Sequence, residues 1–342
     1  MSIQRSEFGK TSSGESVSLF ILTNCHHQRV TITDYGAILV TVEVADRNGQ
    51  VENVNLGYND LSRYLERHPY LGSTVGRFCN RIARGKFQLD GHEYSLVINN
   101  GPNHLHGGTI GFDKQIWTSQ TFEEQDHSGV RFALTSPDGQ EGYPGTLQIS
   151  AEYRWTDSNE LVYQFRAVVL DKPTVLNLTN HAYWNLKGLN QGDVLDHELQ
   201  LSCDHYVAVD ETLIPTGEIA DVRGTALDFR EPHLIGERIL ELPATKGYDH
   251  CFVVNGQSGQ LRTCAVAKNV ASGRVMEVLT TQPGVQLYTG NHLGGGFSPH
   301  SGFCLETQHF PDSPNKPQFP STRLNPGEEF SETTIHRFSV ME

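Results

Sequence analysis

Residues 146–155 read TLQISAEYRW and residues 161–170 read LVYQFRAVVL, and these two stretches decide the fold class. Every second residue of the first stretch, starting at Leu147, is apolar, and polar residues stand between them. The second stretch repeats the alternation from Leu161, after the turn-like sequence TDSNE. Because successive side chains of a strand point to opposite faces, this pattern predicts an antiparallel hairpin with one buried face.

The strand pattern continues along most of the chain. Asp90-Gly91 is a tight-turn dipeptide between two alternating runs in GKFQLDGHEYSLVI, residues 85–98, and predicts a second hairpin. Further strands are expected at RVTITDYGAILVTVEV (29–44), TVLNLTNHAYW (174–184), LRTCAVAK (261–268), RVMEVLTT (274–281) and VQLYTGN (285–291). Short helices are expected at residues 60–67, where Asp60 is a suitable N-cap, and at residues 234–242.

Turn residues are spread evenly, and nothing in the sequence divides the chain. The 33 glycines and 15 prolines punctuate the strands, and no linker, charge block or repeat is visible. We therefore predict an all-β protein: a large antiparallel β-sandwich of packed sheets with a few short peripheral helices, forming one domain over residues 1–342.

Composition limits the possible partners. The chain has 40 acidic and 26 basic residues, and a formal net charge of −14 disfavours binding to nucleic acid or to anionic membrane surfaces. The opening sequence lacks the apolar core of a signal peptide, and no segment approaches the ~18 apolar residues needed to cross a bilayer. The six cysteines are far apart, without a Cys-x-x-Cys pair, so we expect a cytoplasmic protein with reduced, mostly buried thiols.

The segment TVLNLTNHAYW has two different faces. Alternation places these residues on one face: Val175, Asn177, Thr179, His181 and Tyr183. A row of amide, hydroxyl and imidazole groups is typical of the floor of a polar pocket. The alternative is a solvent-facing surface, although such surfaces usually carry Lys and Glu, and this row has neither.

Two histidines in PNHLHGG form a second candidate. His104 and His106 are two residues apart and are expected to project to the same side of an extended segment, as the start of a metal site. A carboxylate soon afterwards is missing, because GGTIGF intervenes before Asp113, and this disfavours the metal site. Gly107-Gly108 suits a backbone that passes close to a ligand, with His106 as a neutral hydrogen-bond donor.

Charged and amide residues recur in three further motifs. GRFCNRIARGKF (76–87) places Asn80 beside Arg81, which can grip hydroxyl oxygens or can belong to a solvated basic loop. GYDHCF (247–252) places Asp249 at a strand start, where it can accept from two hydroxyls or cap a turn. GFCLETQHF (302–310) carries Glu306 inside a buried strand, and a buried carboxylate needs either a structural partner or a chemical role.

Taken in order, these motifs resemble the aldose 1-epimerase family, and specifically its galactose mutarotase branch. The resemblance runs from about residue 70 to residue 310 and includes VDETLIPTGE (209–218) and TTQPGVQLYTGN (280–291). It implies the β-sandwich fold of galactose mutarotases and an isomerase without metal or cofactor. Such an enzyme interconverts the α- and β-anomers of D-galactose, and also of D-glucose, by acid/base opening and closing of the sugar ring.

The resemblance also implies roles for individual residues. Glu306 matches the proton acceptor of the family and His181 its proton donor. Matches to sugar-binding positions are Asn80, Arg81, His106, Asp249 and Gln286, with Tyr183 as a further contact beside His181. Mechanistically, Glu306 is expected to be ionised among hydrogen-bond donors, and His181 is expected to hold a proton. Trp184 or Phe112 is a candidate for covering an apolar sugar face, although either is more often a core residue.

The expected partner is a small-molecule sugar, bound by a monomer or weak homodimer that contacts neither nucleic acid nor membrane. Two alternatives remain open on the same fold. One is a carbohydrate-binding protein without catalysis. The other is a hexose-6-phosphate 1-epimerase, for which Arg77 and Arg84, close to Arg81, are the basic residues that a phosphate needs.

Overall fold

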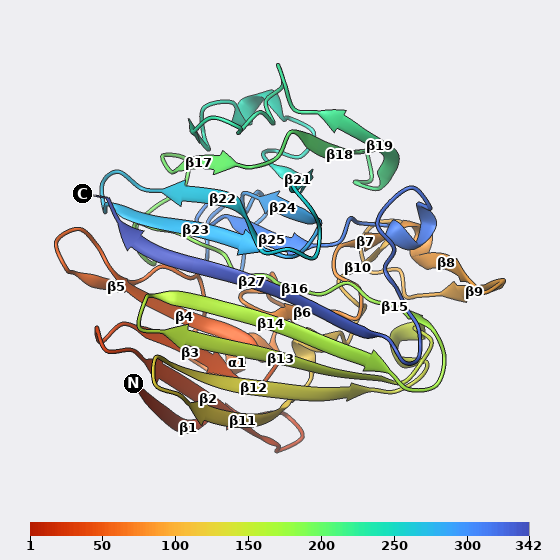
Figure 1. Cartoon of the computed structure of the whole chain (residues 1–342), viewed down its shortest axis with the longest axis horizontal. Coiled ribbons are helices and arrows are strands. Elements are labelled where there is room, and N and C mark those ends of the chain that lie inside the picture. The colour runs from red at the N-terminus through yellow and green to blue at the C-terminus, as the bar shows by residue number, and fades with distance from the viewer. Residues whose placement is uncertain (342) are drawn as a thin grey trace.

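The computed structural model describes residues 1–341, and almost all of its regular structure is β (Figure 1). A nine-stranded antiparallel sheet is the largest layer. In spatial order its strands are β11 (Thr118–Glu123), β12 (His127–Ser136), β13 (Leu147–Thr156), β14 (Glu160–Val169), β27 (Glu329–Val340), β23 (Arg274–Thr280), β22 (Arg262–Lys268), β17 (Glu198–Leu201) and β20 (His233–Leu234). The predicted hairpin is confirmed as β13 and β14, with Ala151 opposite Phe165.

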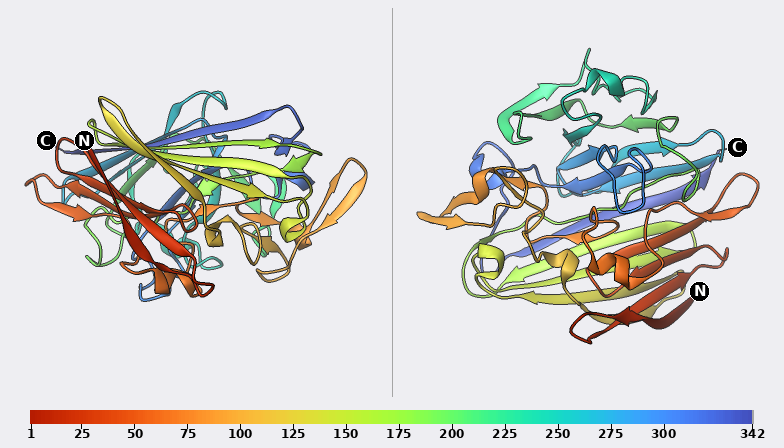
Figure 2. Two further views of the ribbon diagram at one scale, coloured as in Figure 1. Left: turned by 90° about the horizontal axis from the view of Figure 1, so that it is seen from below. Right: turned by 180° about the vertical axis from the view of Figure 1, so that it is seen from behind.

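Two five-stranded sheets pack against this layer. The first contains β1 (Ser2–Lys10), β2 (Ser16–Thr23), β3 (Arg29–Thr33), β4 (Ile38–Ala45) and β5 (Val51–Asn53), in that order. The second has the order β19 (Pro215–Asp221), β18 (His205–Val209), β21 (Asp249–Val253), β24 (Gly284–Tyr288) and β25 (Cys304–Gln308). Figure 2 shows the N-terminal strands lying across one face of the large sheet.

The layers share one hydrophobic core. Phe20 of β2 meets Phe132 of β12 edge-on at 5.7 Å between ring centroids, and Val285 and Leu305 of the second small sheet belong to the same buried cluster. The alternation in β13 explains this packing, because Leu147 and the residues that alternate with it are buried against the small sheets. The all-β sandwich predicted from the sequence is thus confirmed.

Short elements complete the chain. The two-stranded pairs are β6 (Thr74–Val75) with β16 (Thr179–Asn180), β7 (Arg81–Ile82) with β10 (His104–Leu105), β8 (Lys86–Leu89) with β9 (His92–Ser95), and β15 (Thr174–Val175) with β26 (Arg323–Leu324). The helix α1 (Leu61–Leu65) is capped by Asp60, whose side chain accepts from the Arg63 backbone N–H, as predicted. The 3₁₀ turns are η1 (Ala83–Gly85), η2 (Phe112–Lys114), η3 (Gln140–Gly142), η4 (Ile239–Glu241) and η5 (Ser313–Asn315).

The helix predicted at residues 234–242 is wrong. The segment contains the end of β20 and the single 3₁₀ turn η4. Its backbone forms hydrogen bonds with another segment: the N–H groups of Ile235 and Gly236 donate to the carbonyls of His197 and Leu195, respectively. Gly236 also lies so close to Leu195 that a Cβ there would stand 2.9 Å from the Leu195 Cβ. Tertiary pairing therefore overrides the helical pattern.

The strand predicted at residues 174–184 is only partly correct. It is extended, but regular pairing is limited to β15 and β16. Its backbone N–H groups donate in turn to different segments: Leu176 to Thr322, Asn177 to Arg77, His181 to Ser73 and Trp184 to Phe303. The segment therefore crosses the core between sheets, where each residue meets a different neighbour.

Two general expectations can be compared with the structure. All six cysteines are free, and five of them are buried, with Cys25 as the exposed one. None of the helices within residues 1–341 combines the length and apolar character needed to span a membrane.

Candidate active site

A cavity of about 1290 Å³ lies beside β21, β24 and β25 and receives side chains from segments that are far apart in the sequence. Eight residues that the sequence assigned to a site line this cavity: Asn80, Arg81, His106, His181, Tyr183, Asp249, Gln286 and Glu306. The fold thus brings all eight together, and the roles assigned to them stay predictions.

Three of these residues come from neighbouring strands of the second small sheet. Glu306 of β25 is directly opposite Gln286 of β24, so both side chains point to the same face of the sheet. Asp249 lies on the next strand, β21, two residues before Cys251, which pairs with Gln286. The Gln286 Nε2 donates to the Asp249 Oδ1 at 2.6 Å. Strand register therefore builds a row of one amide between two carboxylates.

Glu306 is deeply buried, at 3% exposure, and poorly hydrogen-bonded. Its Oε2 has no hydrogen-bond partner among the residues that the structure describes. Burial, and then the nearby charge of Asp249, raise the pKa of Glu306 well above its ordinary value, while Arg81 acts in the opposite direction. The expectation that Glu306 lies among donors is met only in part: Arg81 acts on its charge, but no residue within 1–341 donates to its Oε2.

His181 lies between two aromatic rings. Tyr183 stacks on it at 5.0 Å and 26° and Tyr70 at 5.9 Å and 21°. Burial lowers the pKa of His181 to about 3, so the imidazole is neutral at neutral pH. Its Nε2 lies 3.6 Å from the Glu306 Oε1, and its Nδ1 lies 3.5 Å from the Cys304 Sγ. The proton that His181 was expected to hold can thus only be the single N–H of the neutral ring.

His106 is fixed by a backbone hydrogen bond. Its Nδ1 accepts from the Asn80 N–H at 3.1 Å, so the neutral ring carries its proton on Nε2. Burial, followed by the proximity of His181 and Arg81, lowers the pKa of His106 well below its ordinary value. The side chain is therefore a neutral hydrogen-bond donor with a defined tautomer.

The ligand atoms of His106, His181 and Glu306 lie within 4.8 Å of one another, a spacing that suits a metal ion. The bond from Asn80 argues against that use, because it leaves His106 with a protonated Nε2 and no free lone pair. The expectation that His104 and His106 project to the same side is wrong. His104 turns away from the cavity and contacts the Val97 carbonyl at 2.8 Å and the Tyr143 hydroxyl at 2.6 Å. A positive φ of 53° at His106 breaks the alternation on which that prediction depended.

Arg81 joins two walls of the cavity. Its Nη2 lies 3.7 Å from the Asp249 Oδ2, and its Nε donates to the Asn100 Oδ1 at 3.1 Å. Asn80 has a left-handed backbone, with φ of 62°, and its Oδ1 accepts from the Arg81 N–H at 2.9 Å. The tight turn at Asn80 thus places the amide and the guanidinium side by side.

Several sequence candidates lie outside the cavity. Asn177 and Thr179 of the predicted polar row are buried against neighbouring backbone and do not line it. Trp184 and Phe112 belong to the hydrophobic core, so the suggested sugar contact is wrong for both.

Arg77 is a buried structural residue. Its Nη1 donates to the carbonyls of Pro144 and Gly145, each at 2.7 Å. Arg84 is exposed and does not line the cavity. Neither is available to bind a phosphate there.

Some cavity residues were missed by the sequence-based prediction. Tyr70, Lys114, His250 and Tyr288 also line the cavity. Tyr70 contacts both central imidazoles, since its ring also lies 4.6 Å from that of His106. Its backbone is left-handed, with φ of 58°, and a tyrosine before a Leu-Gly pair has no periodic signal that marks such a position.

The cavity combines carboxylates, neutral imidazoles, a guanidinium and amides, and this set suits a ligand with several hydroxyl groups. Together with the antiparallel sandwich, this set of groups is consistent with the acid/base site of a sugar isomerase. The sequence model of the family described as Aldose 1-epimerase matches residues 18–337. This chain belongs to the aldose 1-epimerase family and is an aldose 1-epimerase, an isomerase of carbohydrates.

Individual relatives are similar over almost the whole chain. A galactose mutarotase from Bos taurus is 47% identical over 348 residues, with 99% of each chain covered. An aldose 1-epimerase from Escherichia coli is 38% identical, with 95% of this chain and 96% of the relative covered. Among solved structures, galactose 1-epimerase from Lactobacillus acidophilus matches with a TM-score of 0.88 and 30% identity, covering 100% of this chain and 99% of the other.

Proposed function

We propose that this enzyme interconverts the α- and β-anomers of D-galactose, and also of D-glucose. The observation that carries the proposal is the pair formed by Glu306 and His181, whose Oε1 and Nε2 lie 3.6 Å apart at the cavity. Relatives named galactose mutarotase, 47% identical in Bos taurus and 45% identical in Homo sapiens, support galactose as the substrate.

The reaction requires two proton transfers at one carbon of the sugar. Glu306 accepts the proton of the anomeric hydroxyl while the N–H of His181 protonates the ring oxygen, and the ring opens to the aldehyde. Rotation about the bond between the first two carbons exposes the other face, and the two residues then act in reverse. Because the two oxygens are bonded to the same carbon, the groups that serve them must lie close together, as this pair does.

The protonation states fit this sequence. A neutral His181 must gain a proton before it can give one, because loss of its only N–H would leave an imidazolate. Transfer of the Glu306 carboxyl proton to the His181 Nε2, 3.6 Å away, forms the carboxylate base and the imidazolium acid together. This imidazolium gives its proton readily, because burial lowers the pKa of His181 to about 3. Glu306 must ionise first. Arg81 lowers its pKa, and sugar hydroxyls that donate to the Oε2 supply hydrogen bonds that no side chain within residues 1–341 makes to this atom.

The remaining side chains hold the sugar. Asp249 accepts from its hydroxyl groups, while Asn80, Arg81 and the Nε2–H of His106 donate to them. Gln286 fixes Asp249 through the 2.6 Å hydrogen bond, and Tyr183 keeps His181 in place by stacking. Sugar recognition by this row of groups requires neither a metal ion nor a cofactor.

We also propose a cytoplasmic, single-domain enzyme that acts as a monomer or weak homodimer, with no nucleic-acid or membrane partner. The net charge of −14 supports the last point, and the core cluster that joins all three large sheets supports a single domain. No observation favours the alternative functions: the acid/base pair argues against a purely binding role, and Arg77 and Arg84 are not available for a phosphate.

Polarimetry tests the proposal directly. Freshly dissolved α-D-galactose and α-D-glucose are followed with catalytic amounts of protein, and the buffer rate and the rate with heat-inactivated protein are subtracted. Acceleration of both sugars is expected. No acceleration for either sugar would rule out the mutarotase function, and acceleration restricted to a hexose 6-phosphate would favour the phosphate-specific alternative.

A further inference from the structure

The segment that carries His181 runs antiparallel to β25, which carries Glu306. At one end, Trp184 and Phe303 exchange two backbone hydrogen bonds, of 2.7 and 3.0 Å. In the same antiparallel register, three residues before Trp184 and three residues after Phe303, His181 lies opposite Glu306. The two proposed acid/base residues are thus neighbours across a pair of extended segments.

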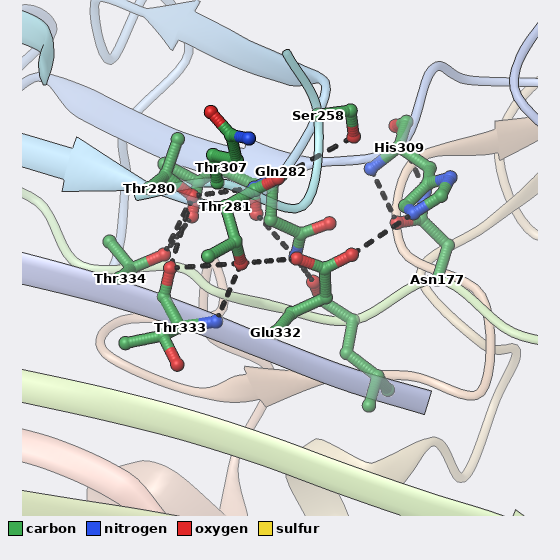
Figure 3. A network of polar contacts seen from close by, with 12 residues as sticks. Asn177, Ser258, Thr280, Thr281, Gln282, Thr307, His309, Glu332, Thr333 and Thr334 are labelled. Atoms are coloured by element: carbon green, nitrogen blue, oxygen red, sulfur yellow. Dashed lines mark hydrogen bonds and ion pairs between the residues drawn. The ribbon is translucent and has the colours of Figure 1, made fainter. Parts of the chain in front are cut away.

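The other end of this pair is closed by a side chain. The Asn177 Nδ2 donates to the His309 carbonyl at 3.0 Å, and the Asn177 Oδ1 accepts from the His309 N–H at 2.9 Å. The carboxamide therefore makes both hydrogen bonds that a backbone peptide group would make in a strand ladder. Figure 3 shows this contact between Asn177 and His309.

Asn177 also holds a third segment. Its backbone N–H donates to the Arg77 carbonyl at 3.1 Å, and its carbonyl accepts from the Cys79 N–H at 2.8 Å. Its Nδ2 lies 3.4 Å from the Cys79 carbonyl. Asn80 and Arg81 follow directly in the sequence, so this fully buried residue joins three of the segments that line the cavity, those that carry Arg81, His181 and Glu306.

The opposite face of β25 is fixed to the large sheet. The hydroxyl groups of Thr307 and Thr334 lie 2.6 Å apart, and the His309 Nε2 lies 3.5 Å from the Glu332 Oε1 (Figure 3). β25 is the end strand of its own sheet, paired there with β24 alone. On its other side the end of β25 has backbone groups that no ladder strand pairs, and the contact with Asn177 lies on that side.

We propose that Asn177 is a positioning residue: its side-chain amide fastens β25 to the segment bearing His181 and so sets the separation of Glu306 and His181. This inference depends on the proposed function. Asn177 lies outside the cavity and does not contact the sugar. It acts through Glu306, and its loss is expected to lower turnover more than sugar binding.

The test is the kinetics of Asn177→Ala, measured by polarimetry well below its melting temperature. We expect kcat to fall roughly 10–100-fold, because a misplacement of ~1 Å can cost about 10²-fold, and KM to change much less. Asn24→Ala is the matched control. Asn24 is also buried, and it links its own segment to a distant one. Its Nδ2 donates to the Thr156 carbonyl at 3.2 Å and to the Asn159 Oδ1 at 2.7 Å. The control is expected to lose stability and to keep the wild-type kcat.

Asn177→Asp gives a second readout that does not depend on the alanine variant folding. An aspartate here faces the carbonyls of His309 and Cys79, so its pKa should be raised, and its protonated form restores a donor. The ratio of variant to wild-type kcat is expected to rise as the pH falls. An unchanged kcat in Asn177→Ala, or a pH-independent ratio for Asn177→Asp, would overturn the inference. Inactive wild-type protein would instead refute the proposed function, so the two failures are distinguishable.

Discussion

The Nε2 of His181 lies 3.6 Å from the Oε1 of Glu306, and both residues are buried, at 4% and 3% exposure. Each residue is held in its less charged form by burial, which raises the pKa of the carboxyl group and lowers that of the imidazole. Charging this buried pair is therefore costly. Under the proposed function, sugar hydroxyl groups that donate to the Glu306 Oε2 couple substrate binding to ionisation of the base.

Removal of either member of the pair is expected to abolish most turnover. Glu306→Gln and His181→Ala should each lower kcat by about 10²–10⁴-fold, the usual contribution of a positioned acid or base. Polarimetry measures kcat, and thermal melting shows whether each variant is folded. Wild-type rates in both folded variants would contradict the proposed roles.

Glu306→Gln is also expected to change stability with pH. Because the pKa of Glu306 is raised in the folded state, the folded protein binds more protons than the unfolded chain above about pH 4.5. The contribution of Glu306 to the stability of the wild type should therefore fall as the pH rises from that value toward the raised pKa. Glutamine cannot ionise, so the variant should be the more stable protein at pH 8, with the difference shrinking toward pH 4.

Urea unfolding of both proteins at pH 4, 6 and 8 measures this difference. The Glu306→Gln change retains the side-chain shape, which limits packing effects. A variant that is less stable than wild type at pH 8 would show that the carboxylate is stabilised by contacts other than those described.

Asp249 and Arg81 should shift the pH profile in opposite directions. The charge of Asp249 raises the pKa of Glu306, and Arg81 lowers it. Asp249→Asn should therefore move the acidic limb of kcat/KM to lower pH, and Arg81→Met should move it to higher pH. Each variant should also raise KM by roughly 10–100-fold, since a hydrogen bond to a charged group contributes about 1.5–3 kcal/mol. If the acidic limbs of the two variants shift in the same direction, this electrostatic explanation is contradicted.

His336 provides a prediction about acid stability that is independent of catalysis. It is buried beside Tyr163 and Trp184, and neither ring nitrogen has a hydrogen-bond partner within residues 1–341. Burial lowers its pKa to about 3. Between pH 3 and pH 6.5, His336 binds more protons in the unfolded chain than in the folded protein. The contribution of His336 to stability therefore rises with pH and is lost as the pH falls.

The His336→Leu variant has no group at this position that takes up a proton at low pH, so it avoids this loss of stability. It also places an apolar side chain in an apolar site. The variant should gain about 1–3 kcal/mol from removal of the unpaired polar groups, and its advantage over wild type should grow from pH 7 to pH 4. Urea unfolding measures the advantage, and an unchanged kcat at pH 7 serves as the control. An advantage of equal size at both pH values would show that protonation of His336 plays no part.

Local patterns were sufficient where one segment bonds mainly to its sequence neighbours. The β13–β14 hairpin, the turn at Asp90-Gly91 and the cap at Asp60 were predicted correctly, because each depends on alternation or on a short-range hydrogen bond. The helix at residues 234–242 failed, because Ile235 and Gly236 bond to a distant segment. The shared orientation expected for His104 and His106 was wrong, because the left-handed backbone at His106 separates the two side chains.

By itself the sequence determined the all-β fold and the chemical types of the site, because both depend on residue identity and local periodicity. Only the tertiary structure decided how those groups behave. The pKa directions of Glu306 and His181 result from burial, which is set by segments more than a hundred residues apart. Asn177 could be read from the sequence as a pocket residue, yet long-range hydrogen bonds make it the link between three segments. Burial and long-range contacts are properties of the packed chain, and for this reason no local pattern contains them.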